Sequence, residues 1–269
     1  MSSKPAAREL EPATISEHAG VRYLHLGTPW VQGAMRIRKP EALELEYVQR
    51  MMVWMLFRPA AELTSGHAVQ LGLGAGAITR FCHQVLKMRT TAVELNPTVI
   101  DACRLWFRLP AESARFTLLE MDAAAFAGDP ERAGSADVLC VDLYDHEAAS
   151  PVLDSVAFYR DCRRLLADGG VMTVDLFGRD ASFDVSVGRI VAAFGRDAVR
   201  TLSPTREGNQ VVVAMKQVTA PDRALLAERA QNIETRFKLP ARKWLRMIQL
   251  LPEPEPGAAG PSGATPPPA

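Results

Sequence analysis

The sequence AVQLGLGAGAITRFCHQVLKMRTTAVELNP, residues 68–97, decides the fold. An apolar run enters a helical pattern through Gly72, Gly74 and Gly76, and a second apolar run ends at Glu94. Closely spaced glycines let the backbone bend sharply and bring amide N–H groups to the helix N-terminus, where a ligand can approach. The stretch therefore predicts a β–α–β unit with a ligand at its glycine turn.

The same alternation of apolar runs and helical patterns continues along the chain. Near-continuous runs rich in Val and Leu are typical of a parallel sheet covered on both faces. The last two runs are joined only by PTREGN, residues 204–209, which leaves no room for a crossover helix, so they must pair as an antiparallel hairpin. The sequence predicts an α/β, Rossmann-like fold of the S-adenosylmethionine-dependent methyltransferase type, with a seven-stranded, mostly parallel sheet. Its strands are expected at 68–73, 90–95, 115–121, 137–144, 171–177, 198–203 and 210–215.

The flanking segments differ in composition from this central part. We expect a flexible N-terminus over 1–20 and a small β segment followed by an apolar helix over 21–58. The methyltransferase-type domain then spans 59–217, and residues 218–251 form a C-terminal helical segment. The tail, 252–269, is rich in Pro, Gly and Ala and is expected to be disordered, because it has too few apolar residues to form a core.

Bulk composition narrows the class of function. Lys plus Arg and Asp plus Glu each number 31, so the net charge is zero, which argues against a nucleic-acid partner. No apolar run approaches the roughly 20 residues that cross a bilayer, and the polar N-terminus is unlike a signal peptide, so we expect a cytoplasmic protein without a membrane partner. The 4 cysteines form no C-x-x-C pair and the 5 histidines are isolated, so no metal site is expected.

Acidic residues follow the second and third predicted strands. Glu94 lies about 20 residues after the glycine turn, where an acid accepts hydrogen bonds from ribose hydroxyls, although it could also be a solvated acid at a strand end. Asp122, in LLEMDAAAF, could accept a hydrogen bond from an adenine amino group or cap the following helix, and both roles stay open. We take both acids as candidate nucleoside ligands.

The fourth predicted strand ends in Asp142, Leu143, Tyr144 and Asp145. Asp142 follows the apolar run VLCV, where a charge without a partner is costly. Two carboxylates three residues apart suit a cationic amine, because one can accept its proton while the other holds a remote ammonium group. Tyr144 adds a hydroxyl and a ring. The alternative is an ordinary loop with two acids and a stacking tyrosine.

Taken in order, these motifs resemble the spermidine synthase (polyamine aminopropyltransferase) family over residues 21–216. The segments that carry the resemblance are LGLGAG, AVELNPTVIDACRLWF, MDAAAF, DLYD and FYRDCRRLLADGGVMTVDLF. It implies a transferase, expected to be a homodimer, that moves an aminopropyl group from decarboxylated S-adenosylmethionine to a diamine such as putrescine and releases methylthioadenosine. No metal takes part.

The resemblance also assigns roles to individual residues. Asp142 would help to deprotonate the attacking amine, and Asp145 would hold the far end of the polyamine. Glu94 and Asp122 would bind the nucleoside. The helix with Tyr47 falls where the family has a substrate-binding Tyr-His-Glu segment. Gln32 lies upstream, as a further residue of the cofactor site.

The chain departs from the family pattern at several positions. Ala75 replaces an acid that contacts the amino end of the aminopropyl donor, Val48 and Gln49 replace His and Glu, and His146 replaces a proline. Two other functions therefore stay open. One is an S-adenosylmethionine-dependent methyltransferase, which Ala75 favours because the lost acid would repel that cofactor's carboxylate. The other is a non-catalytic nucleoside-binding or assembly protein.

Overall fold

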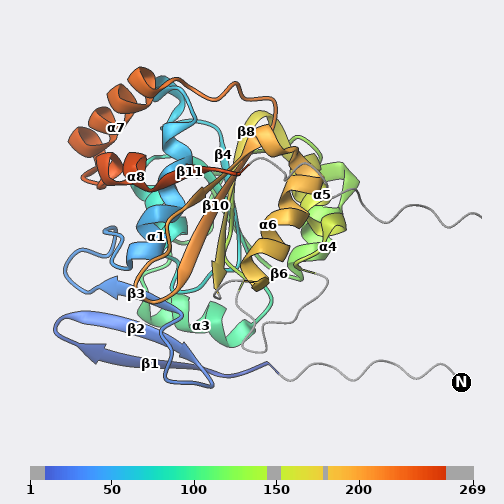
Figure 1. Ribbon diagram of the computed structural model, residues 1–269. Helices are drawn as coiled ribbons and strands as arrows, with labels where there is room; N and C mark the ends of the chain where they lie inside the picture. The colour runs from blue at the N-terminus through green and yellow to red at the C-terminus, as the bar shows by residue number, and fades with distance from the viewer. Residues whose placement is uncertain (1–9, 144–152, 178–180, 253–269) are drawn as a thin grey trace, which may run out of the picture.

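The computed structural model describes residues 10–143, 153–177 and 181–252, which form one large sheet with helices on both faces and a smaller sheet at one end (Figure 1). The smaller sheet is antiparallel and consists of β1 (Ala13–His18), β2 (Val21–Leu26) and β3 (Gly33–Arg36). The larger sheet has eight strands, in the spatial order β11 (Ile248–Leu250), β9 (Val199–Leu202), β10 (Asn209–Met215), β8 (Leu166–Phe177), β7 (Ala136–Val141), β4 (His67–Leu71), β5 (Arg89–Glu94) and β6 (Phe116–Glu120).

The larger sheet confirms the predicted fold class. Strands β8, β7, β4, β5 and β6 are parallel to one another. Strand β10 runs antiparallel to both of its neighbours, β8 and β9, as the short connection at 204–209 predicted. One strand was not predicted: β11, within the segment expected to be helical, pairs antiparallel with β9. It covers the backbone groups at the edge of β9, which would otherwise be unpaired.

Helices cover both faces of the sheet. On one face α1 (Glu46–Met51), the short helix Met52–Leu56, α2 (Ala77–Arg80), α7 (Arg223–Phe237) and α8 (Ala241–Met247) share a hydrophobic core with the strands. On the other face α4 (Ala123–Gly128), α5 (Val156–Leu165) and α6 (Ala181–Phe194) form a second core. A third core lies between the smaller sheet and α3 (Pro97–Trp106). Helices therefore alternate with the parallel strands along the chain, as the sequence pattern predicted.

The expectation of a flexible N-terminus over 1–20 is wrong for Ala13–His18, which form β1. Apart from Ala13 and Ile15 the side chains of this strand are exposed, so its sequence lacks the apolar residues that mark a buried strand. Backbone pairing holds it to β2 across a tight turn at Ala19 and Gly20, both with positive φ. The expected disordered tail, 252–269, lies outside the described part of the chain apart from Pro252.

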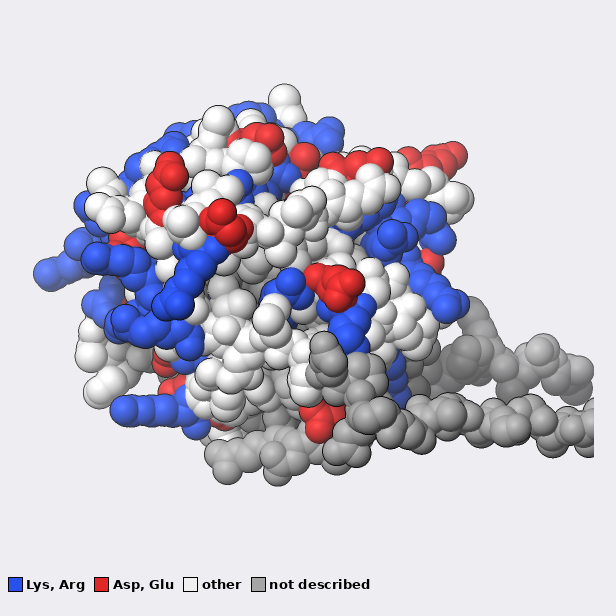
Figure 2. Space-filling model, turned by 45° about the horizontal axis from the view of Figure 1, so that its top comes forward, with Lys and Arg blue, Asp and Glu red and all other residues white. Residues whose placement is uncertain are grey.

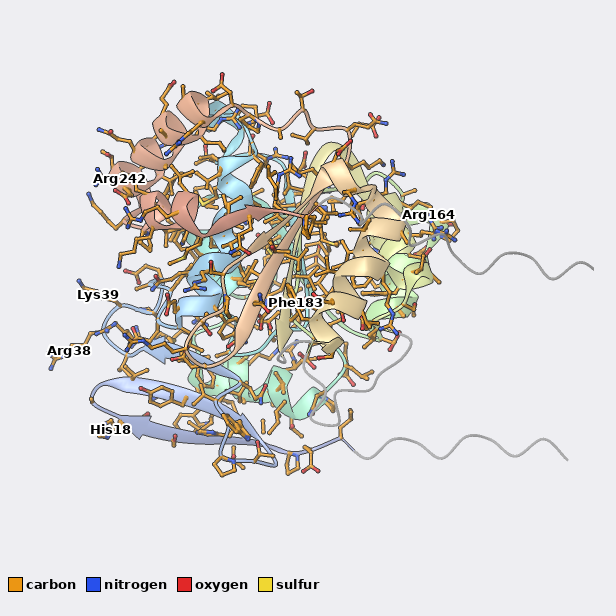
Figure 3. All side chains as sticks on the ribbon, in the orientation of Figure 1. His18, Arg38, Lys39, Arg164, Phe183 and Arg242 are labelled. Atoms are coloured by element: carbon orange, nitrogen blue, oxygen red, sulfur yellow. The ribbon has the colours of Figure 1, made fainter. Side chains whose placement is uncertain are left out.

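Side chains fill the space between the layers, whereas Arg38 and Lys39 point away from the molecule (Figure 3). Figure 2 shows Lys and Arg side chains close to Asp and Glu over one face of the surface. Among the described helices, none is both long enough and apolar enough to cross a membrane.

Candidate functional site

The carboxyl ends of β4, β5, β7 and β8 meet at one edge of the sheet, beside the smaller sheet and the start of α1. In an open parallel α/β sheet, ligands bind in the crevice outside these strand ends. We refer to this edge, with Glu94, Asp142 and Tyr47, as the strand-end site.

The glycine turn after β4 adopts a backbone that favours glycine. Gly72, Gly74 and Gly76 have φ of 84°, 50° and 69°, in the left-handed region. A Cβ atom at Gly72 would lie 2.0 Å from the carbonyl oxygen of Asp142, so the turn and the end of β7 are in direct contact. Gly76 is the N-cap of α2, which places the turn at a helix N-terminus.

The carboxylate of Glu94 joins β5 to the glycine turn. Its Oε2 accepts a hydrogen bond from the amide of Leu73 at 2.9 Å, and its Oε1 accepts one from the amide of Asn96 at 2.9 Å. Burial raises the pKa of Glu94, and these amide hydrogen bonds act in the opposite direction. Each carboxylate oxygen has a second lone pair, so the group can still accept from the two hydroxyls of a ribose.

Asp142 lies at the end of β7, facing Tyr47 on α1. The hydroxyl of Tyr47 is 3.5 Å from Asp142 Oδ2 and 3.5 Å from the carbonyl oxygen of Gln32, which precedes β3. Burial raises the pKa of Asp142 to about 7, helped by the negative charge of Glu94 and opposed by the hydrogen bond from Tyr47. Burial also raises the pKa of Tyr47 well above its usual value, so the phenol stays protonated. A carboxylate in this state can exchange a proton near neutral pH.

Sequence reasoning missed Asp175, which lies next to Asp142. Strands β7 and β8 are parallel with Val141 opposite Val174, so the next residue of each strand is an aspartate. Asp175 Oδ2 accepts a hydrogen bond from Asn209 Nδ2 at 2.7 Å, whereas its Oδ1 is buried and has no partner among the described residues. The signal was present: VMTV precedes Asp175 as VLCV precedes Asp142.

The remaining predicted residues are not brought into contact with Asp142 or Glu94 by any bond among the described residues. Asp122 follows β6 and caps α4, with its carboxylate accepting from the amide of Ala125 at 2.9 Å, so the capping role is present in the structure. Tyr144 and Asp145 lie outside the described residues. Within the described part of the chain, no group of three His, Cys, Asp or Glu side chains could hold a metal ion.

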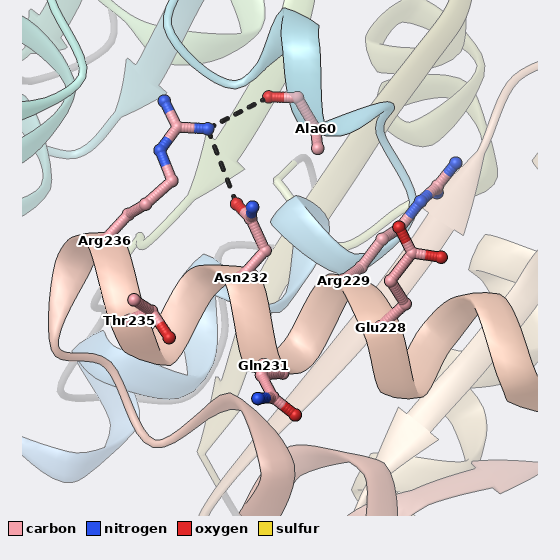
Figure 4. A pocket seen from close by; sticks show the side chains of 7 residues that line it. All are labelled: Ala60, Glu228, Arg229, Gln231, Asn232, Thr235 and Arg236. Atoms are coloured by element: carbon pink, nitrogen blue, oxygen red, sulfur yellow. Dashed lines mark hydrogen bonds between the residues drawn. The ribbon is translucent and has the colours of Figure 1, made fainter.

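A depression on the surface of α7 is a poorer candidate (Figure 4). There Arg236 donates hydrogen bonds to the carbonyl of Ala60 and to Asn232 Oδ1, and Arg229 donates to the carbonyl of Leu56. Both arginines of the depression therefore bond to the protein itself. Ala60 precedes β4, so the depression lies near the amino end of that strand, away from the strand-end site.

Comparison with known proteins finds relatives in one family. Residues 71–176, from the end of β4 to the end of β8, match the family model described as "Spermine/spermidine synthase domain". The polyamine aminopropyltransferase of Neisseria meningitidis serogroup B is 34% identical over 215 residues, 79% of each chain. That of Chromobacterium violaceum is 32% identical over 239 residues, 88% of each chain.

A solved structure agrees in fold. A probable spermidine synthase from Corynebacterium glutamicum superimposes with a TM-score of 0.71 at 18% identity, covering 97% of this chain and all of the other. At this identity the likeness concerns the fold.

Proposed function

Because this chain belongs to the polyamine aminopropyltransferase family, we propose that it transfers an aminopropyl group from decarboxylated S-adenosylmethionine to a diamine such as putrescine. The observation that carries the proposal is the half-buried carboxylate of Asp142, which lies at a strand end between the glycine turn and Tyr47. A raised pKa at such a place suits a base that acts near neutral pH.

The proposed donor site is built around the glycine turn. Gly72, Gly74 and Gly76 allow close approach of the nucleoside, and Glu94 accepts hydrogen bonds from its ribose. Asp122 contributes on the adenine side while it caps α4. Gln32, whose carbonyl faces Tyr47, closes the site from the smaller sheet.

The proposed reaction begins with a proton transfer. A free alkylammonium has a pKa near 10.4, so it must lose a proton before its nitrogen can act as a nucleophile. Asp142 accepts that proton. The nitrogen lone pair then forms a bond to the carbon next to the sulfonium, the carbon–sulfur bond breaks, and its electron pair stays on sulfur. The products are the longer polyamine and methylthioadenosine.

Three further residues take part in the proposed reaction. Tyr47, which hydrogen-bonds to Asp142, belongs to the amine site. By family resemblance Asp145 holds the far ammonium of the diamine, and Tyr144 lines the same place. We also propose that the protein is a homodimer.

One observation favours a second candidate, an S-adenosylmethionine-dependent methyltransferase. Ala75 in the glycine turn is 2% exposed and carries no charge, so this position offers nothing to repel the carboxylate of that cofactor. The acidic surroundings of Asp142 favour the aminopropyl donor, which lacks that carboxylate.

Two measurements test the proposal. Ligands that bind the native state raise its melting temperature, so decarboxylated S-adenosylmethionine and methylthioadenosine should each do so, and S-adenosylmethionine should do so less. With putrescine present, the protein should then release methylthioadenosine. Stabilisation by S-adenosylmethionine alone, with no diamine consumed, would replace this proposal by the methyltransferase.

A further inference from the structure

We propose that Asp175 is a second carboxylate of the amine site and that it binds, together with Asp142, the ammonium nitrogen that attacks the donor. The inference rests on the proposed function and adds to it a residue that sets the preference for a cationic amine.

The geometry brings the two carboxylates side by side. They follow Val141 and Val174, which lie opposite each other in the parallel pair β7–β8, so both side chains project from the same face of the sheet. On this face lies the core that includes Val48 and Met51 of α1, the helix that also carries Tyr47. The two acids therefore share the space under the start of α1.

The bonding of Asp175 is incomplete. Asn209, at the start of β10, satisfies Oδ2, and Oδ1 is buried without a hydrogen-bond partner in the described chain. A buried polar atom without a partner is costly, and native structures seldom leave one without a reason. A ligand that brings an N–H donor would satisfy it.

Among the described residues, the groups that act on the pair are acidic or uncharged. Tyr47 faces it from α1, Asn209 from β10 and Glu94 from the end of β5. Within the described residues, neither Asp142 nor Asp175 forms an ion pair with a Lys or Arg side chain. Burial and the neighbouring Asp142 raise the pKa of Asp175 well above its ordinary value. In the free protein a shared proton reduces the repulsion of the pair.

An ammonium group matches this arrangement because it has three N–H donors and a full positive charge. When it binds, the proton held by the pair leaves to solvent and both carboxylates accept hydrogen bonds from the nitrogen. For reaction, the nitrogen gives one proton to Asp142, and Asp175 keeps a second N–H in place. The lone pair forms the new carbon–nitrogen bond, the carbon–sulfur bond breaks, and sulfur takes its electrons.

The test is calorimetry of putrescine binding to the protein saturated with methylthioadenosine, in buffers of different ionisation enthalpy. The parent should release close to one proton per putrescine bound near pH 7. Asp175→Asn should bind putrescine about 10- to 150-fold more weakly, the range for losing a charge-assisted hydrogen bond, and should release fewer protons per putrescine bound, because only the carboxyl group of Asp142 remains to lose one. Its affinity for methylthioadenosine should stay unchanged, which reports an intact fold.

Two controls separate the possible outcomes. Asp168→Asn makes the same change at the exposed start of β8 and should behave as the parent, whereas Asp175→Glu keeps the charge and should retain most of the affinity. The role of Asp175 is overturned if Asp175→Asn binds putrescine as tightly as the parent, or if the parent releases no proton. In either case the proposed function still stands if the parent consumes putrescine. If the parent neither binds nor consumes putrescine, the proposed function fails first.

Discussion

Asp142→Asn should make the protein more stable while it removes the proposed base. The charged carboxylate at this position is destabilised by burial and by the neighbouring Glu94. An amide keeps the shape and can accept the hydrogen bond from Tyr47, but it carries no charge. Active-site groups held in an unfavourable state commonly show this exchange of stability for activity.

The magnitude follows from the pKa of Asp142. Its rise from 3.8 to about 7 spans about three pKa units, and at about 1.4 kcal/mol per unit the ceiling is ~4 kcal/mol. Because the side chain is only half-buried, and solvent screens part of this, we expect about 1–3 kcal/mol. Because the pKa of Asp142 is higher in the folded protein, its contribution to folding stability is fully present below its ordinary pKa of 3.8. That contribution is lost as the pH rises towards 7. The gain from the amide is therefore largest above pH 7.

Thermal unfolding of parent and variant between pH 4 and pH 8 measures this difference. For a chain of this size, about 1–3 kcal/mol corresponds to roughly 2–8 °C in melting temperature. The two proteins should converge towards pH 4, and the variant should melt higher at pH 8. Its turnover with putrescine should fall by about 100-fold or more, the usual scale for a positioned base. An Asp142→Asn protein that melts at or below the parent temperature at pH 8 would refute the electrostatic argument.

Three other substitutions test the packing around the site. Glu94→Ala should abolish methylthioadenosine binding, seen by calorimetry, and should also lower the free energy of unfolding by about 2–4 kcal/mol, because the amides of Leu73 and Asn96 each lose an acceptor. Asp154→Ala should lower the free energy of unfolding in urea by about 1–3 kcal/mol, since this carboxylate accepts from side chains of α5 and α6; an unchanged midpoint would contradict that. Gly33→Ala should weaken methylthioadenosine binding, because the new Cβ would lie 2.5 Å from the amide nitrogen of Ala75, and parent-like affinity would show that β3 can shift without cost.

The sequence predicted the fold well where the apolar pattern is strong. The five parallel strands and the terminal hairpin each come from apolar runs whose spacing left few topologies. It failed for β1 and β11. Ala13–His18 are mostly exposed and Ile248–Leu250 form a three-residue edge strand, so both are held by backbone pairing, which leaves little trace in side-chain pattern.

The candidate site residues rest on a similar kind of signal. Glu94 and Asp142 were singled out because each lies at the end of a strand close to a recognised motif. Asp175 has the same local pattern but lies 33 residues after Asp142, and only strand pairing places the two together. The two hydrogen bonds that Glu94 accepts from backbone amides depend on the geometry of the glycine turn, so the sequence alone could not predict them.

The packing of β3 on the glycine turn disfavours an acidic residue at position 75. Gly33 lies so close to Ala75 that an added Cβ would be 2.6 Å from the Ala75 Cβ, and the Ala75 side chain is buried in the core under the smaller sheet. An aspartate at position 75 would force β3 away and bury a carboxylate in the core that contains Leu24, Met35 and other apolar side chains, which is costly. At the ends of β7 and β8, by contrast, Tyr47 and Asn209 supply hydrogen bonds to the two carboxylates. In the proposed reaction, Asp142 and Asp175 meet the ammonium group of the acceptor, whereas the glycine turn meets the nucleoside of the donor.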